Sequence, residues 1–397
     1  MKQTYHAEHG RKSRGIAGYA SLILFFVLLF GFAVLNLFWP KRTLSELENR
    51  KLAQMPSFSW TALLNGDWFE DFSTYIQDQV AFRDGWIDLQ SDFNALCLQK
   101  VEQNGILLGK DHWMFTRNFG TPSIKQLDKN VSAVAEFGSR YPGRVTFLLA
   151  PSASVIYEEE LPLAAPMVDE NTMLDEIFAA VSPTADVIDL RSVYTDAKDE
   201  YLYYRTDHHW TTYGAYLAYQ QFCTLKGLTP FDTSAHSSVD VPDFYGTHYS
   251  STRYWNVAPD TITYYPLDNP MTVYQVNGEA DFSTAETATM VDTEKFETRD
   301  KYAAFLGGNN GYSVIEGDGE GSILVIKDSY ANCFIPYLTA NYAKIGVIDF
   351  RNYAFGPDSI IEQEGYDQIL VLYNFQTFLT DTKVIYLNRP TTLTAES

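Results

Sequence analysis

The chain has 397 residues, with 29 Lys and Arg against 50 Asp and Glu, which gives a formal net charge of −21. A hydrophobic content of 46% and a charged content of 20% predict a folded protein with a sizeable core and exclude disorder over most of its length. The acidic balance also excludes nucleic acid as a partner, because proteins that bind it by charge use Lys and Arg to displace counterions from phosphates. Cys97, Cys223 and Cys333 are far apart and odd in number, so they predict neither a disulfide framework nor a zinc ribbon.

An uncharged run from Gly15 to Pro40 is longer than the ~20 residues that a helix needs to cross a bilayer core. It predicts a transmembrane anchor within residues 1–40. The residues before it carry an excess of positive charge, which places the N-terminus in the cytoplasm and the rest of the chain outside: Lys2, Arg11, Lys12 and Arg14 against Glu8. A cleaved signal peptide is the alternative, although its apolar region usually has ~7–15 residues and ends at a small-residue cleavage site. This run ends in Leu-Phe-Trp-Pro-Lys-Arg, so we expect a single-pass protein in the cell membrane.

Residues 41–103 are predicted to form a helical lead between the anchor and the main domain. Apolar side chains recur at alternating spacings of four and three, the stripe of an amphipathic helix: Phe82, Trp86, Leu89, Phe93 and Leu96. We interpret this stripe as a packing surface.

Residues 104–397 have the pattern of an α/β domain. Gly and Asn around short apolar runs predict a hairpin over 104–115. Two apolar runs that flank a helical stretch at 168–181 predict a β-α-β unit: 145–150 and 187–190. A helix is expected over 213–226, ending at Gly227. Three further strands are expected at 322–327, 344–350 and 368–373.

Between these parts, residues 231–320 carry 15 acidic and 4 basic side chains and no long apolar helix. We expect an inserted, irregular β-rich lobe at about 230–321 in a three-layer α/β/α domain. The acidity of this segment favours a neutral ligand over a polyanion.

Chemistry-bearing residues follow the predicted strands, where the sites of open α/β sheets gather. Ser329 follows a strand and precedes a helix, whose N-terminus favours a developing oxyanion. Asn374, at the end of a later strand, is a second candidate donor. Asp207 and His209 are two apart, so on extended chain they face the same side and the carboxylate can orient the imidazole. Together they predict a Ser329–His209–Asp207 triad.

Two other interpretations of these residues stay open. In the first, His209 and Asp207 are ligands of a metal hydrolase, because histidine and carboxylate are an ordinary ligand pair. In the second, Ser329, His209 and Asp207 have no catalytic role. His236 and His248 match no known ligand spacing, and we interpret them as surface histidines.

Four stretches resemble the bacterial DHHW protein family: NRKLAQMPSFSW (49–60), TDHHWTTYGAY (206–216), FLGGNNGYSVIE (305–316) and the stretch 323–353 around Ser329. That family is similar to exported alginate O-acetyltransferases, whose SGNH-hydrolase-like domain has a circularly permuted strand order. The segment 104–115 resembles the G-x-D-G-W-L-F stretch of those domains, with His112 in the usual glycine position. Two departures are that Lys327 replaces the glycine before the D-S pair and that a single residue separates Asp207 from His209.

The resemblance implies transfer of acetyl groups to hydroxyls of a cell-surface polysaccharide through an acetyl-serine, without a metal or cofactor. The resemblance places the family's D-x-H-W unit on Asp207, His209 and Trp210 and its serine on Ser329. It places the asparagine that donates to the oxyanion on Asn374, and it puts Arg351 or Asn352 near the second sequence block of SGNH enzymes. It also implies a multi-pass membrane acyltransferase as the acetyl donor. A carbohydrate acetyl esterase with the same triad, and a non-catalytic glycan-binding or export module, are the alternatives.

Overall fold

The computed structural model describes residues 16–119, 124–274 and 285–389. The charged residues that predict the membrane orientation, Lys2 to Arg14, lie outside the described residues. The chain divides into two compact units, residues 1–89 and 90–397.

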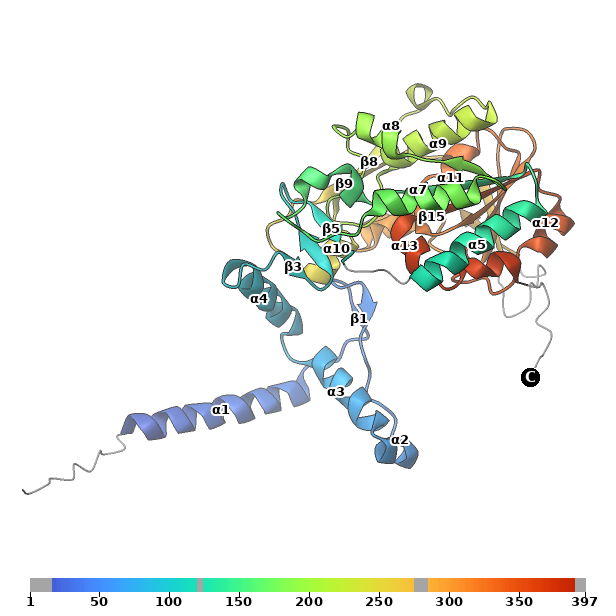
Figure 1. The fold of residues 1–397 in the computed structure, drawn as a ribbon. Coiled ribbons are helices and arrows are strands. Elements are labelled where there is room, and N and C mark those ends of the chain that lie inside the picture. Colours follow the sequence, from blue (N-terminus) through green and yellow to red (C-terminus); the bar gives the residue numbers. More distant parts are fainter. Residues whose placement is uncertain (1–15, 120–123, 275–284, 390–397) are drawn as a thin grey trace, which may run out of the picture. The chain divides into compact units, whose positions relative to one another are not determined.

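The first unit begins with the apolar helix α1 (Ile16–Phe38), drawn in blue in Figure 1. Its part from Tyr19 to Phe38 has a mean hydropathy of 2.6 and is long enough to cross a membrane. A membrane anchor and a signal sequence both fit a helix of this kind near the N-terminus. The elements that follow are β1 (Leu44–Ser45), β2 (Arg50–Lys51), α2 (Trp60–Asn65) and α3 (Asp67–Gln79), and then α4 (Arg83–Leu96), which crosses the boundary between the units.

Helix α4 confirms the helix predicted from the apolar stripe. The side chains of the stripe are nevertheless 50–63% exposed: Phe82, Trp86, Leu89, Phe93 and Leu96. Phe82 and Trp86 still pack on other rings, with centroids 4.4 Å from Trp39 and 6.3 Å from Phe32, so part of the stripe is a packing surface as we expected.

The second unit is built on an eight-stranded mixed sheet with the strand order β11-β10-β12-β14-β13-β15-β6-β7. The strands are β6 (Val145–Ala150), β7 (Asp186–Ile188), β10 (Pro270–Tyr274), β11 (Ala285–Thr289), β12 (Tyr312–Glu316), β13 (Ser322–Lys327), β14 (Lys344–Ile348) and β15 (Gln368–Asn374). The five strands from β14 to β7 are parallel, whereas β12, β10 and β11 extend the sheet in antiparallel fashion. The carboxyl ends of β13, β14, β15 and β6 therefore meet at one edge.

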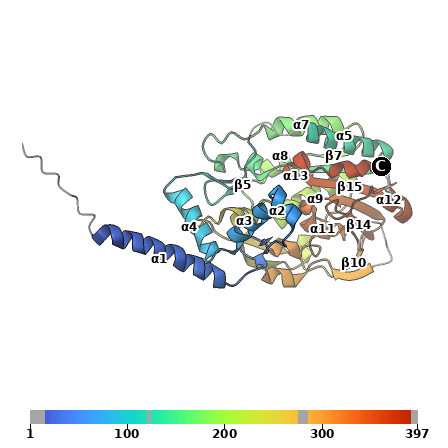
Figure 2. The same cartoon turned by 90° about the horizontal axis from the view of Figure 1, so that it is seen from below.

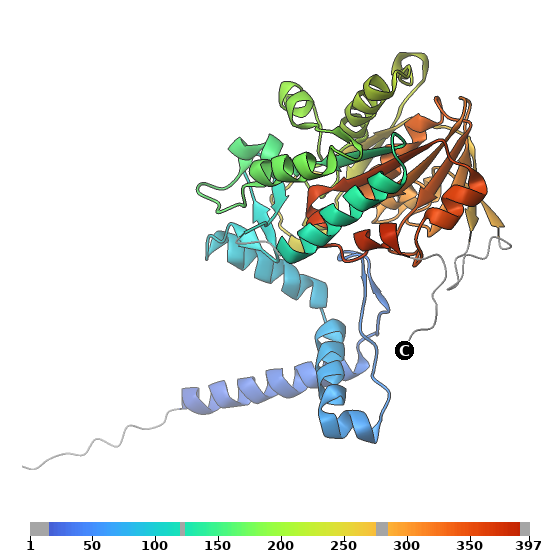
Figure 3. The same ribbon diagram turned by 45° about the vertical axis from the view of Figure 1, so that its right-hand side comes forward.

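Both faces of this sheet are covered, which explains why its central strands are apolar without interruption. Successive residues of β13 alternate between two cores, with Val325 in one and Leu324 in the other. One core includes α9 (Thr212–Lys226) and α11 (Ile335–Leu338), and the other includes α5 (Ile124–Arg140), α7 (Glu170–Val181), α12 (Asp358–Glu364) and α13 (Phe375–Thr380). Helices α5 and α7 lie side by side over the sheet (Figures 2 and 3). The β-α-β unit and the helix ending at Gly227, whose φ is +66°, are confirmed.

The acidic segment 231–320 joins the main domain more closely than expected. Its strands β10 and β12 continue the central sheet, with Tyr312 of β12 paired to Ile348 of β14. A separate two-stranded sheet pairs β8 (Val239–Phe244) with β9 (Asp260–Tyr264). The expectation of an inserted lobe is thus corrected, because part of the segment is an extension of the sheet. Short helices complete it: α10 (Thr247–Thr252) and the 3-10 helices η2 (Thr233–Ala235), η3 (Thr293–Glu297) and η4 (Lys301–Ala304).

The predicted hairpin at 104–115 is a three-stranded antiparallel sheet of β3 (Glu102–Gln103), β4 (Ile106–Leu108) and β5 (Met114–Thr116). Asp111 and His112 form its turn with φ of +45° and +67°. A left-handed φ favours glycine, which explains why glycine is usual where His112 stands. The remaining elements are α6 (Ala153–Ile156), α8 (Arg191–Asp196), η1 (Glu158–Glu160), η5 (Ser329–Cys333) and η6 (Val384–Asn388).

Candidate active site

Ser329 starts the 3-10 helix η5 directly beyond the end of β13. The buried carboxylate of Asp328 holds this junction: one oxygen accepts from the backbone N–H of Tyr330 at 2.8 Å, the other from that of Asn374 at 2.8 Å. The serine is half-buried, and within the described part of the chain its own N–H has no acceptor. The turn between strand and helix thus presents a hydroxyl and a free backbone donor together.

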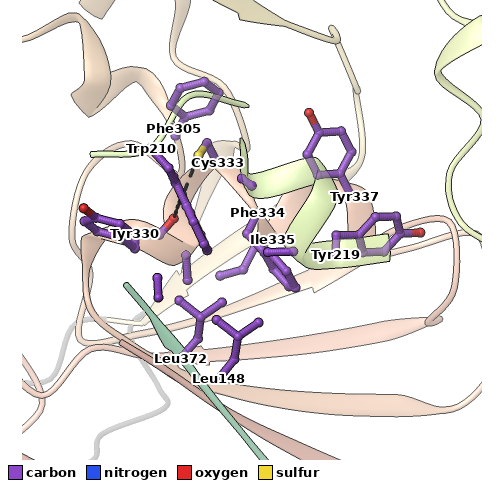
Figure 4. Packing of buried hydrophobic residues seen from close by; sticks show 14 of the residues in the cluster. Leu148, Trp210, Tyr219, Phe305, Tyr330, Cys333, Phe334, Ile335, Tyr337 and Leu372 are labelled. Atoms are coloured by element: carbon purple, nitrogen blue, oxygen red, sulfur yellow. Dashed lines mark hydrogen bonds between the residues drawn. The ribbon is translucent and has the colours of Figure 1, made fainter. Parts of the chain in front are cut away.

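The loop that carries the histidine closes on itself between Tyr203 and Trp210, which form an antiparallel bridge. The carboxylate of Asp260, on β9, accepts from the backbone N–H groups of Arg205 at 2.9 Å and Thr206 at 2.8 Å. At the other end of the loop the fully buried Trp210 donates its indole N–H to the carbonyl of Tyr330 at 2.9 Å. Figure 4 shows Trp210 packed between Tyr330 and Phe334, so the loop is fixed to the helix of the serine.

Asp207, His209 and Ser329 lie in one hydrogen-bonded line. Nδ1 of His209 lies 2.5 Å from Oδ1 of Asp207, and its Nε2 lies 2.9 Å from Oγ of Ser329. The second oxygen of Asp207 accepts from the N–H of Thr247 at 2.7 Å and from its hydroxyl at 3.0 Å. His208 points elsewhere and contacts the Thr247 hydroxyl at 2.6 Å through Nδ1. This geometry suits proton transfer from the serine hydroxyl to an imidazole that a carboxylate orients.

Burial decides the charge state of the base. It lowers the pKa of His209 to about 4, helped by His208 and Arg351 and opposed by Asp207. Burial would raise the pKa of Asp207, but the charges of His208 and His209 outweigh it and hold this pKa well below its usual range. At neutral pH His209 is therefore uncharged and Asp207 is ionised, the states in which Nε2 can accept the serine proton.

Tyr302, which the sequence did not predict as a site residue, contacts both His209 and Ser329. The ring of Tyr302, on η4, lies 3.8 Å from the His209 ring at an interplanar angle of 14°. Its hydroxyl donates to the carbonyl of Ser329 at 3.1 Å. Thr247, Asp260 and Tyr302 all come from the acidic segment, which has no sequence pattern that points to the site.

The expected oxyanion donor Asn374 has its amide engaged. Its Nδ2 donates to Asp328 at 2.5 Å and to the Thr377 hydroxyl at 2.7 Å, and its Oδ1 accepts from the N–H of Thr377 as the cap of α13. The amide of Asn352 donates to the carbonyl of Asn309 at 2.6 Å. In this structure both asparagines support the edge of the sheet rather than offer a free donor.

Arg351 and Lys327 share the carboxylate of Asp349. Nε of Arg351 donates to Oδ1 at 2.9 Å, and Nζ of the buried Lys327 lies 3.0 Å from Oδ2. Burial lowers the pKa of Lys327, whereas the two cations overcome burial and lower the pKa of Asp349 to about 2. Lys327, which replaces the family glycine, is thus accommodated by an ion pair.

The ligand atoms of Asp207, His208 and His209 lie within 4.8 Å of one another, as in some metal sites. Asp207 and His209 are, however, hydrogen-bonded at 2.5 Å, whereas two ligand atoms on a tetrahedral ion stand about 3 Å apart or more. The arrangement fits a hydrogen-bonded pair better than a ligand set. His236 is exposed, as expected, but His248 is only 5% exposed, so its interpretation as a surface histidine is wrong.

A cavity of about 110 Å³ is lined by Asp207 of the triad, whereas Ser329 and His209 are not among its lining residues. Asp207, His208 and Tyr330 line it from one side, and Ser152 and Asn374 line it from the ends of β6 and β15. The site therefore has an adjacent space with polar walls.

Two protein-family models match parts of this chain. The DHHW protein family matches residues 185–348, a range that contains Asp207, His209 and Ser329. The resemblance to the DHHW family is confirmed. The family described as the SGNH hydrolase-like domain of acetyltransferase AlgX matches residues 106–238, which include the first two of these residues.

Individual relatives are distant. A probable alginate O-acetylase AlgJ of Pseudomonas fluorescens is 24% identical over 182 residues, which are 43% of this chain and 45% of that protein. The chain therefore spans less than half the length of this relative. Two solved structures share the fold. A DHHW family protein of Eubacterium siraeum has 24% identity and a TM-score of 0.63, over 74% of this chain and 98% of that one. Bacillus cereus PatB1 with a sulfonyl adduct has 18% identity and a TM-score of 0.59, over 70% of this chain and 97% of that one.

Proposed function

We propose that this protein is an O-acetyltransferase that modifies hydroxyls of a cell-surface polysaccharide through an acetyl-serine on Ser329. The observation that carries the proposal is His209, which lies within hydrogen-bond distance of both Asp207 and Ser329. The similarity to a probable alginate O-acetylase and to the AlgX acetyltransferase domain supports acetyl transfer as the reaction.

In the first half-reaction, Nε2 of His209 takes the proton of Ser329 as Oγ attacks the carbonyl carbon of the acetyl donor. The tetrahedral intermediate collapses, the donor's oxygen or sulfur leaves with the proton from His209, and the acetyl group remains on the serine. In the second, His209 takes the proton of a sugar hydroxyl, whose oxygen attacks the acetyl-serine. The intermediate collapses to the acetylated sugar, and the proton returns to Ser329.

The oxyanion of both intermediates needs hydrogen-bond donors in place before it forms. The free backbone N–H of Ser329 is the first donor that we propose. Arg351 is the second, because it follows β14, the strand that pairs in parallel with the strand before Ser329, and so stands at the same edge of the sheet. Trp210 acts as a support that fixes the loop of the base, and Asn374 and Asn352 hold the edge of the sheet.

The order of the active residues along the chain supports a circularly permuted SGNH-like domain over residues 104–397. His209 precedes Ser329 by 120 positions, whereas ordinary SGNH enzymes have the serine first. Residues 1–40 would then hold the protein at the membrane by α1 with the domain outside the cell, and residues 41–103 would lead to it. A multi-pass membrane acyltransferase would supply acetyl groups across the bilayer.

The test compares wild-type protein with Ser329→Ala and His209→Ala, incubated with an activated acetyl ester and with a sulfonyl fluoride. We expect mass spectrometry to find one acetyl or one sulfonyl group on Ser329 of the wild type and none on either variant. An unmodified wild type would overturn the triad.

Adding oligosaccharide to the acetylated protein separates the candidate reactions. Acetyl-oligosaccharide is the product of a transferase. Free acetate alone, with the sugar unmodified, would show a carbohydrate acetyl esterase instead.

A further inference from the structure

A second and larger cavity, of about 300 Å³, lies on the same domain. Its walls are made by five tyrosines, five threonines and one glutamate: Tyr201, Tyr213, Tyr216, Tyr265, Tyr337, Thr211, Thr212, Thr233, Thr261, Thr263 and Glu200. None of the three triad residues lines it. The lining has no lysine, arginine or aliphatic side chain, so it is a surface of aromatic rings and hydroxyl groups with a single carboxylate.

The inner walls of this cavity are fixed by their own hydrogen bonds. The hydroxyl of Tyr216 donates to the carbonyl of Phe231 at 2.8 Å, and that of Tyr337 donates to the carbonyl of Thr212 at 3.1 Å. Tyr216 and Tyr337 also pack edge to face, with ring centroids 5.2 Å apart. Their ring faces are therefore set before any ligand arrives, which lowers the entropy cost of binding.

Other polar groups of the lining are unused. Within the described part of the chain, the hydroxyls of Tyr213 and Tyr265, those of Thr233 and Thr261, and the carboxylate of Glu200 have no hydrogen-bond partner. Tyr213 is 43% exposed. Partial burial raises the pKa of its hydroxyl, and the negative charge of Glu200 raises this pKa further. The cavity thus offers free donors and acceptors as well as fixed rings.

Fixed rings and free hydroxyl groups together match one class of ligand. A pyranose ring has C–H faces that pack on aromatic rings and equatorial hydroxyls that exchange hydrogen bonds with tyrosine, threonine and carboxylate. Among the residues that line the cavity, an anionic sugar would meet the carboxylate of Glu200 and no cation. We propose that this cavity is a second carbohydrate site, which binds one uncharged sugar unit.

The cavity lies apart from the triad. Figure 4 shows Tyr337, which lines it, on the opposite side of the Trp210 and Phe334 cluster from Tyr330, whose ring contacts that of His209. Thr211 and Thr212 nevertheless follow His209 by only two and three residues. A glycan chain held here stays on the domain while another of its units, or another chain, reaches Ser329. This role rests on the proposed function, whereas sugar binding does not.

Binding is measured by calorimetry on the full chain in detergent micelles. The protein carries the Ser329→Ala substitution, so that no turnover occurs during the titration. The probes are oligosaccharides of glucose, mannose, galactose and N-acetylglucosamine, and an oligouronate as the anionic comparison. We expect at least one neutral series to bind and the oligouronate not to bind. Tyr213→Ala and Tyr265→Ala should each weaken binding about tenfold, as loss of an aromatic contact does.

Tyr254→Ala is the matched control, because Tyr254 is a half-buried tyrosine that does not line the cavity. The site is overturned if no neutral series binds at millimolar concentration, if the oligouronate binds equally well, or if Tyr254→Ala weakens binding as much as the cavity variants. Thermal unfolding of each variant shows that it is folded.

The two proposals fail separately. Intact sugar binding in a protein that forms no acetyl-serine would leave the cavity site standing and remove the transferase. In the active protein, Tyr213→Ala and Tyr265→Ala should raise the KM for a polysaccharide acceptor and leave hydrolysis of a small activated ester unchanged.

Discussion

The ring of Tyr302 lies parallel to that of His209 at 3.8 Å, while its hydroxyl holds the carbonyl of Ser329 at 3.1 Å. One side chain thus contacts both the proposed base and the proposed nucleophile. A small displacement of either residue would lengthen the distance over which the proton moves from Ser329 to His209. Tyr302 is therefore placed to act as a positioning residue for this transfer.

Replacing Tyr302 separates its two contacts. Tyr302→Phe keeps the stacked ring and should lower kcat only a few-fold, since one hydrogen bond contributes about 1 kcal/mol. Tyr302→Ala removes the ring and should lower kcat about 100-fold with little change in KM. Steady-state kinetics with an activated acetyl ester measures both. Equal losses in the two variants would show that the hydroxyl alone matters.

The low pKa of His209 predicts an unusual pH profile. The imidazole acts as a base only when neutral, so activity should be lost as the pH falls through about 4 rather than through the ordinary 6.5. The measurement is kcat/KM for an activated ester between pH 3.5 and 8, with unfolding monitored in parallel. An acidic limb centred near 6.5 in the folded protein would contradict the burial of the base.

The same shift predicts how stability depends on pH. The folded protein binds the His209 proton less readily than the unfolded chain, so its contribution to stability is complete above about 6.5 and decreases as the pH falls toward about 4. His248, whose pKa burial lowers to about 3, adds to the effect. Denaturant unfolding at pH 7 and 5 should show a smaller decrease for His209→Gln than for the wild type.

Gly246 supports the carboxylate of the triad by having no side chain. A Cβ on this residue would lie 2.2 Å from Cβ of Asp207, although its φ of −79° suits any residue. Gly246→Ala should therefore displace Asp207 and reduce kcat by about 100-fold or more. Gly85→Ala is the control, because a Cβ there has nothing within 4 Å. Full activity in Gly246→Ala would show that the contact is not required.

The ion pair behind the nucleophile should matter for stability. Asp349→Ala leaves the Lys327 ammonium, whose side chain is 1% exposed, without its oppositely charged partner, and we expect a loss of about 3–5 kcal/mol in the free energy of unfolding. Glu159→Ala breaks the exposed pair with Lys198 and should cost at most about 1 kcal/mol. Chemical denaturation compares them. Similar losses would show that Lys327 is not a buried charge.

The sequence predicted the parts of the fold that depend on local pattern. Continuous apolar runs identified β6, β13, β14 and β15, because strands buried on both faces exclude polar residues. The spacing of the α4 stripe predicted a helix, but it could not show that these side chains remain exposed, since exposure depends on neighbours distant in the chain.

By itself, the sequence determined Ser329, His209 and Asp207 as the candidates, because strand-end position and two-residue spacing are local properties of the chain. Only the tertiary structure decided that the three are hydrogen-bonded in series and that Asn374 is engaged with Asp328. It also decided that Tyr302 stacks on His209, that Thr247 bonds Asp207, and that Asp260 holds the loop at Thr206. These contacts join segments 40 to 120 residues apart. Their geometry comes from the packing of the acidic segment against the sheet, and no short-range pattern encodes it.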